Sequence, residues 1–319
     1  MKFLETKLGS LLRNKKVLAG LALLGVVGLL LAQFVLRPYV YKLRSGVREI
    51  DIPGAAIAYR DLGKGSPVVV IVSGMACAMD GYHVLQKSLS DVTRVIAYDR
   101  PGLGFSEPNV DSRKLDVIDR DMKNVLEALD APPPYVLIGH SLGGHIIRYY
   151  ADKHPGEVAG LVFIDHPHED WFRYIRKTWT PEESKNYFKW WAPDNEGFTG
   201  VPLEEMLTYE KNCDMVRGIK IDPDISALMF TGNNYGHFRK SSPGKDLDRE
   251  QWASMQGSLL EGVKDARHIV DWDAGHMLHK DKPEMVEREI EKFVLRLREK
   301  AKATSSAQRD AAGAVATPR

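Results

Sequence analysis

Apolar residues fall into short runs and longer periodic segments that alternate along the chain from about residue 47. The run Val68–Val72 consists of five β-branched residues, which predicts a strand buried on both faces of a sheet. Other apolar runs predict buried strands at 94–98, 135–138, 161–164 and 227–230, and the segment 267–271 is also strand-like. Helix-like stretches lie between them, at 80–90, 113–130, 142–154 and 283–300. This alternation predicts an α/β fold with a mostly parallel central sheet and helices on both faces.

The alternation stops between about residues 166 and 222. Four of the six tryptophans lie in this stretch, which is rich in other aromatic residues and has no strand pattern. A long aromatic insertion after a strand of a parallel sheet is typical of a lid over a pocket. A small helical subdomain that only covers core gives the same pattern. We expect a helical lid at about 166–222.

The N-terminal part of the chain has a different pattern. Residues 17–36 carry no charge and one polar side chain, Gln33. As a helix they extend about 30 Å, the thickness of a bilayer's hydrocarbon core. The segment is longer than the apolar part of a signal peptide, lacks an A-x-A cleavage pattern, and is apolar on all sides, unlike a core helix. It therefore predicts one uncleaved transmembrane anchor between a basic flank, 1–16, and a linker, 37–46.

Basic residues set the expected orientation of this anchor. The flank 1–16 carries five lysines and arginines, and the segment 37–51 carries four. The positive-inside rule then favours a cytoplasmic N-terminus and a soluble domain outside the cytoplasm. At the other end, residues 301–319 are rich in Ala, Ser, Thr and Gly without apolar periodicity, which predicts a disordered tail.

Overall composition excludes several classes of protein. The net charge is +1, which gives no reason to expect binding to nucleic acid. The only two cysteines, Cys77 and Cys213, exclude a disulfide scaffold and a four-cysteine zinc site, and we expect both thiols to be unpaired.

The first candidate for chemistry is a G-x-S-x-G motif at residues 139–143, centred on Ser141. It directly follows the strand-like run 135–138 and directly precedes the helix-like segment after it. A sharp strand-to-helix turn of this kind raises a serine hydroxyl off the sheet edge and requires glycines where a Cβ would clash. The motif alone arises by chance in roughly one chain in ten. Its position between a strand and a helix makes Ser141 a candidate nucleophile.

In this respect residues 47–300 resemble the α/β-hydrolase superfamily. Three other segments carry the resemblance: Y-D-R-P-G-L-G-F-S at 98–106, S-G-M at 73–75 and A-G-H at 274–276. The resemblance implies an oxyanion hole made by the backbone amides of Met75 and Leu142. Ser73 stands where the family usually has histidine, which leaves a backbone hole intact. Asp99 and Arg100 are expected to support turns through hydrogen bonds.

The general base is expected to be His276. It lies between the predicted strand 267–271 and the final helix, and it follows Ser141 in the order that this fold requires. His279, the nearest rival, is expected in a loop or at the surface.

The sequence gives a weaker signal for the acidic member of the triad, because no carboxylate follows the strand 227–230, where the family usually has it. Asp165 ends the preceding strand, and some branches of the family place their acid there. We therefore predict Asp165 as the third member, which would hold the base in one tautomer. The alternative is that Asp165 caps the first turn of the lid. Asp271 and Asp273 rank lower because neither follows a suitable strand.

The resulting hypothesis is a membrane-anchored serine hydrolase that needs no cofactor or metal and acts on a small acyl substrate, with a lipid-derived ester as the working choice. Two alternatives remain. A catalytically idle hydrolase could serve as a tethered binding module. A metal-dependent hydrolase could use the cluster His166, His168, Glu169 and Asp170, although no H-E-x-x-H spacing is present. The serine at position 141 argues against dehalogenase and epoxide-hydrolase chemistry, which use a carboxylate nucleophile.

Overall fold

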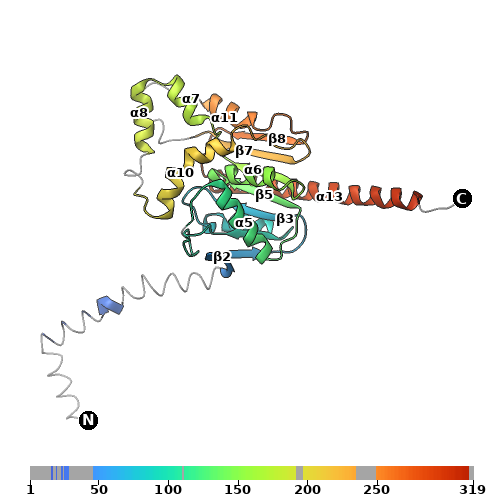
Figure 1. Cartoon of the computed structure of the whole chain (residues 1–319), viewed down its shortest axis with the longest axis horizontal. Coiled ribbons are helices and arrows are strands. Elements are labelled where there is room, and N and C mark those ends of the chain that lie inside the picture. Colours follow the sequence, from blue (N-terminus) through green and yellow to red (C-terminus); the bar gives the residue numbers. More distant parts are fainter. Residues whose placement is uncertain are drawn as a thin grey trace, which may run out of the picture. The chain divides into compact units, whose positions relative to one another are not determined.

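The computed structural model describes residues 16, 19, 23, 25–28, 46–109, 111–191, 197–234 and 249–315. Contacts divide the chain into two units, residues 1–48 and 49–319 (Figure 1). The second unit contains the sheet and nearly all of the described helices. Most of the predicted anchor at 17–36 and the predicted linker at 37–46 lies outside the described residues.

Eight strands form one sheet in the order β1-β2-β4-β3-β5-β6-β7-β8. Strand β2 runs antiparallel to β4, and the strands from β4 to β8 are parallel to their neighbours. The predicted parallel sheet is therefore confirmed, and β1 and β2 extend it beyond the strands that the sequence indicated. The strands are β1 (Arg48–Ile52), β2 (Ala55–Leu62), β3 (Val68–Val72), β4 (Val95–Tyr98), β5 (Tyr135–His140), β6 (Val158–Ile164), β7 (Ser226–Gly232) and β8 (Ala266–Asp271).

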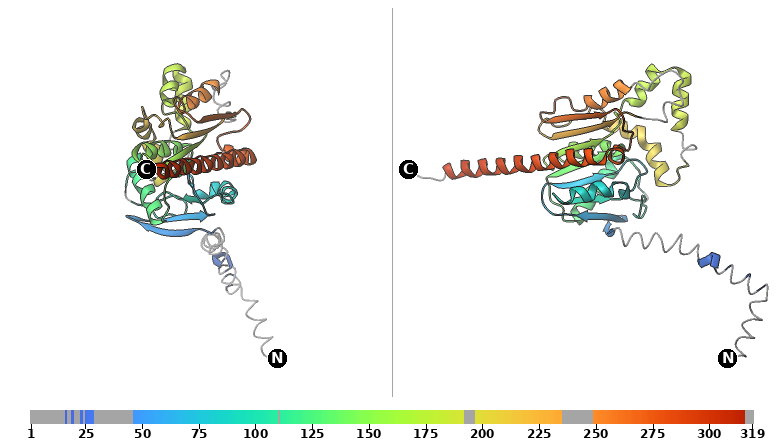
Figure 2. Two further views of the ribbon diagram at one scale, coloured as in Figure 1. Left: turned by 90° about the vertical axis from the view of Figure 1, so that its right-hand side faces the viewer. Right: turned by 180° about the vertical axis from the view of Figure 1, so that it is seen from behind.

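Helices cover both faces of this sheet (Figure 2). Helices α5 (Leu115–Ala128) and α6 (Leu142–Lys153) pack together on one face, and α4 (His83–Leu89) and α13 (Pro283–Val315) pack together on the other. The shorter elements are η2 (Met79–Tyr82), α11 (Arg249–Ser258) and α12 (Leu278–Asp281). Because parallel strands end at one edge of the sheet, the segments after β3, β5 and β6 meet there.

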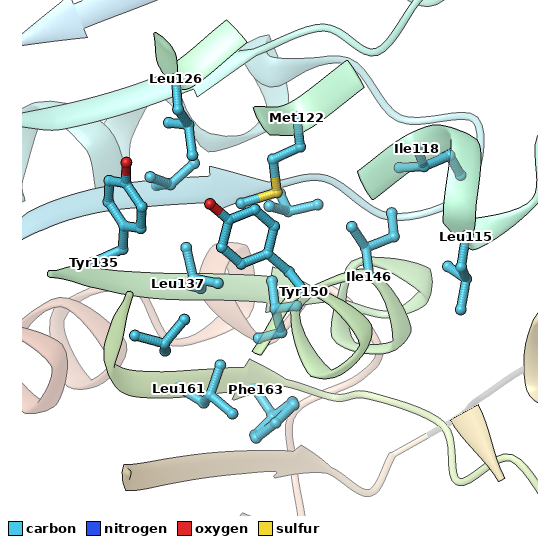
Figure 3. Packing of buried hydrophobic residues seen from close by; sticks show 14 of the residues in the cluster. Leu115, Ile118, Met122, Leu126, Tyr135, Leu137, Ile146, Tyr150, Leu161 and Phe163 are labelled. Carbon is cyan, nitrogen blue, oxygen red and sulfur yellow. The ribbon is translucent and has the colours of Figure 1, made fainter. Parts of the chain in front are cut away.

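The core between the sheet and helices α5 and α6 is formed by alternate residues of the buried strands. Figure 3 shows Leu137 of β5 and Leu161 and Phe163 of β6 directed toward apolar side chains of the two helices. Those helical residues include Ile118 and Met122 of α5, and all of these side chains are almost completely buried. This packing fixes β5 against α6, the two elements that flank the candidate nucleophile.

Among its described residues, the insertion between β6 and β7 contains three helices: α7 (Trp171–Thr178), α8 (Pro181–Trp190) and α10 (Val201–Val216). A capping box starts α8, since the Thr180 side chain accepts from the Glu183 amide while the Glu183 carboxylate accepts from the Thr180 amide. Trp171, Tyr187 and Trp252 form a small aromatic core with Ile175. The insertion is thus helical, as predicted, and many of its aromatic residues pack against one another.

The C-terminal segment differs from the sequence expectation. Helix α13 continues to Val315, so residues 301–315 are helical where the composition predicted a disordered tail. Alanine, lysine, glutamine and arginine are strong helix formers, and they extend the helix without an apolar face.

We find no helix within the described residues that combines the length and the apolar character needed to cross a bilayer. Cys77 and Cys213 are both free thiols, as expected, and burial raises the pKa of Cys213 to about 12.

Candidate active site

Ser141 occupies a sharp turn between β5 and α6. Its backbone has φ 52° and ψ −121°, a conformation that non-glycine residues rarely adopt. A Cβ at Gly139 would lie 2.5 Å from the carbonyl oxygen of Gly143, and one at Gly143 would lie 2.3 Å from that of Val72. Both glycines of the motif are therefore required by contacts between backbone segments. The strained serine turn that the motif predicted is present.

Substitution of Gly139 by alanine tests this packing. No rotation of a side chain can relieve a contact between a Cβ and the Gly143 carbonyl, so we expect a loss of about 3 kcal/mol in the free energy of unfolding. Urea unfolding of the full chain in detergent provides the measurement. Gly81→Ala is the control, since its Cβ would lie 3.7 Å from the flexible end of Lys280, and we expect a change within about 0.5 kcal/mol. Equal losses for both variants would contradict this account.

Asp165 and His276 are brought together from β6 and from the loop after β8. The His276 Nδ1 lies 2.7 Å from the Asp165 Oδ2, and the Asp165 side chain is completely buried while that of His276 is 35% exposed. A carboxylate at this distance holds the proton on Nδ1, which leaves Nε2 to accept a proton. The structure therefore brings together the two side chains that the sequence proposed as acid and base.

The other carboxylate oxygen of Asp165 accepts three further hydrogen bonds. Its donors are the Gly232 amide at 3.3 Å, the Trp252 indole at 3.2 Å and the Gln256 side-chain amide at 3.1 Å. The backbone of Asp165 is also in the left-handed region, at φ 44°. Asp165 does not cap the insertion, because the N-cap of α7 is Asp170. The carboxylate is held in one orientation from β7, α11 and His276 at once.

A chain of hydrogen bonds through His140 connects the base to the nucleophile's turn. His140 Nε2 lies 2.9 Å from the carbonyl oxygen of His276, and the two rings lie 4.6 Å apart. His140 Nδ1 lies 2.7 Å from the Tyr82 hydroxyl, which accepts from the Gly74 amide at 3.1 Å. Burial holds the pKa of His140 well below its ordinary value, so the ring is neutral. It donates from Nε2 and accepts at Nδ1, which holds the His276 backbone against His140, the residue directly before Ser141.

The predicted oxyanion residues lie beside this turn. A Cβ at Gly74 would approach the Ser141 Cβ to 3.3 Å, so the loop that carries Met75 touches the nucleophile. Leu142 is the first residue of α6. Within the part of the chain that the structure describes, neither the Met75 nor the Leu142 amide donates a hydrogen bond. Both amides remain candidates for an oxyanion hole.

Asp99 and Arg100 support turns, as the sequence predicted. The two carboxylate oxygens of Asp99 accept from the Met79 amide at 2.6 Å and the Phe105 amide at 2.9 Å. The Arg100 guanidinium donates to the carbonyl oxygens of Ser73 at 2.7 Å and Gly74 at 2.8 Å.

The expectation for His279 changes. His279 is buried in α12 rather than at the surface; its ring stacks on Tyr82, and burial lowers its pKa to about 4. Sequence could not show this, because the loop before α12 folds back toward η2. The metal-capable cluster is dispersed: Glu169 pairs with Arg148 and Asp170 with Arg217. Among the described residues no group of three or more such side chains could hold a metal ion.

Sequence reasoning missed four residues of the site: Tyr82, Glu205, Trp252 and Gln256. Each reaches the site from a helix distant in sequence, and no local motif marks any of them. Among the described residues, neither the Asp271 side chain nor the Asp273 side chain forms a hydrogen bond with His276. Instead, the Asp271 carboxylate accepts hydrogen bonds from the backbone amides of Asp273 and Ala274 and so shapes the turn before His276.

Part of the chain resembles known proteins. A family profile described as alpha/beta hydrolase fold matches residues 67–189. The uncharacterized protein YbdG of Bacillus subtilis (strain 168) is 29% identical over 118 residues, a match that spans 36% of each protein. The chain therefore spans about a third of the length of that relative.

Solved structures share the fold. Mouse alpha/beta hydrolase domain-containing protein 10 superposes with a TM-score of 0.59 at 17% identity, covering 79% of this chain and 99% of its own. A thermophilic esterase from Thermogutta terrifontis gives a TM-score of 0.56 at 18% identity, covering 78% and 99%. Together with the eight-stranded, mostly parallel sheet, these matches show that the chain has an α/β-hydrolase fold.

Proposed function

We propose that this protein is a serine hydrolase that cleaves an acyl bond, a carboxylic ester in the first instance. The observation that carries the proposal is the 2.7 Å contact between His276 Nδ1 and the buried Asp165, next to the strained turn of Ser141. An acid that fixes a histidine tautomer beside an activated serine is the arrangement needed for nucleophilic acyl transfer.

In the proposed mechanism, His276 Nε2 removes the proton from the Ser141 hydroxyl as its oxygen attacks the acyl carbonyl. The amides of Met75 and Leu142 donate to the oxyanion of the tetrahedral intermediate. His276 then returns the proton to the leaving alcohol as the acyl–oxygen bond breaks, which leaves an acyl-enzyme. Water, deprotonated by His276, hydrolyses that ester and regenerates Ser141.

We further propose a lipid-derived ester as the substrate and a membrane as its location. The insertion between β6 and β7 is rich in aromatic residues, and Trp252 joins its buried aromatic cluster to Asp165. An anchor at residues 17–36, with the hydrolase domain outside the cytoplasm, would tether the domain to a lipid bilayer. In this proposal the insertion acts as a lid.

Active-site labelling and a substrate panel test the proposal. A fluorophosphonate probe should react with the full chain in detergent, and peptide mass spectrometry should find the adduct on Ser141. A panel of p-nitrophenyl esters with graded acyl chains should show turnover that rises with chain length.

The outcomes separate the rival functions. Absence of labelling and of turnover would favour a tethered binding module, and chelator-sensitive turnover without labelling would favour a metal-dependent enzyme. Labelling with much faster turnover of short, water-soluble esters or amides would keep the serine hydrolase and overturn the lipid substrate.

A further inference from the structure

A buried ion pair joins the helical insertion to the loop that carries the candidate oxyanion amide. Arg100, which follows β4, and Glu205 of α10 lie 105 residues apart in sequence. The Arg100 Nε lies 2.7 Å from the Glu205 Oε1, and the Nη2 lies 3.0 Å from the Oε2. Their side chains are 2% and 0% exposed. Removing one partner of such a pair is destabilising, because it leaves an uncompensated buried charge.

Both members of the pair also hold the loop of residues 73–77 directly. Arg100 donates to the carbonyl oxygens of Ser73 and Gly74. The Glu205 Oε2 accepts from the amide of Ala76 at 2.8 Å. The loop is therefore held by its carbonyl groups on one side of Met75 and by an amide on the other.

The contact between Glu205 and the Ala76 amide holds a strained segment of backbone. Four non-glycine residues of the described chain have φ in the left-handed region, and three of them are Ala76 at 55°, Ser141 and Asp165. A strained backbone persists only when its surroundings hold it in place. Ala76 directly follows Met75, and in this conformation its amide donates a hydrogen bond to the Glu205 carboxylate.

We propose that Glu205, acting with Arg100, is a positioning residue that aims the Met75 amide at the oxyanion, so that the helical insertion contributes to catalysis through the loop it holds. This inference rests on the proposed hydrolase function. It also assigns α10 a role beyond covering the site: acyl transfer is fast only while α10 is docked on the loop.

Glu205→Gln is the first test. Each carboxylate oxygen of Glu205 accepts from at least one N–H group. In the glutamine variant the side-chain NH2 must replace one of these oxygens, and as a donor it cannot accept the hydrogen bond that the oxygen accepted. We expect kcat for p-nitrophenyl ester hydrolysis to fall about tenfold or more, below the full loss of an oxyanion donor, while KM stays within about twofold. Deuterium uptake by the backbone amides of residues 73–79 should rise.

Glu169→Gln is the matched control. Glu169 forms an equally buried pair with Arg148, at 2.6 Å, with side chains 6% and 2% exposed. None of the hydrogen bonds of that pair reaches residues 73–77. We expect the control to lower the unfolding temperature without the selective loss of kcat or the faster exchange at 73–79.

A double variant, Arg100→Met with Glu205→Leu, keeps the test decisive if the single variant does not fold. It removes both buried charges, so stability should largely return, whereas the loss of kcat should remain because the loop contacts are absent. Wild-type kcat in either folded Glu205 variant, or an equal kcat loss in Glu169→Gln, would overturn the inference. If the wild type itself lacks turnover, the proposed function fails, and deuterium uptake alone decides whether Glu205 holds the loop.

Discussion

Replacement of Ser141 by alanine is expected to lower kcat for ester hydrolysis by about four to six orders of magnitude, with little change in KM. The substitution removes the nucleophile and leaves the rest of the site in place. The positive φ of the turn is tolerated by the small side chain of alanine almost as well as by serine. Fluorophosphonate labelling should disappear in the same variant.

Ser258→Ala provides the control for this experiment. Ser258 is an exposed residue of α11 whose hydroxyl donates only to the Met255 carbonyl among the described contacts, so labelling and kcat should match the wild type. Hydrolysis by Ser141→Ala at more than a hundredth of the wild-type rate would remove Ser141 from the mechanism.

Asp165→Asn is expected to lower kcat by about four orders of magnitude without unfolding the site. Three donors surround the Oδ1 atom of Asp165, so the asparagine oxygen will take that position and its amide group will face His276. His276 Nδ1 must then accept a hydrogen bond, which moves the ring proton to Nε2. In that tautomer the ring cannot remove a proton from Ser141.

The matched control is Asp273→Asn, which changes the same group at an exposed carboxylate three residues before His276. Its kcat should stay within about twofold of the wild type, because an isolated exposed charge contributes little. An Asp165→Asn enzyme with near-normal kcat, or an Asp273→Asn enzyme with the larger defect, would assign the acid to another residue.

The positions of Ser141, Asp165 and His276 could be predicted because each follows a strand of a parallel sheet. Such strands end at one edge, so residues that follow them meet whatever their separation in sequence. The contact between Asp165 and His276, 111 residues apart, is a direct result of this geometry. The hydrophobic pattern therefore carried the information for both the fold and these side chains.

Residues that reach the site from helices could not be predicted in the same way. Glu204 and Glu205 are adjacent and chemically identical, yet the side chain of Glu204 is 56% exposed and that of Glu205 is completely buried. The difference depends on how α10 packs against the loop at 73–77, which no local pattern specifies. The burial of His279 is unpredictable for the same reason, since its surroundings come from η2 and β5.

The ends of β6 and β7 and the turn before His276 are in direct contact. The Gly232 amide donates to Asp165, and a Cβ at Gly232 would lie 2.2 Å from the Gly275 carbonyl oxygen. The backbone at the end of β7 is thus pressed against the turn before His276, which leaves no room for a side chain at Gly232, so this end of β7 can serve Asp165 only through its backbone amide.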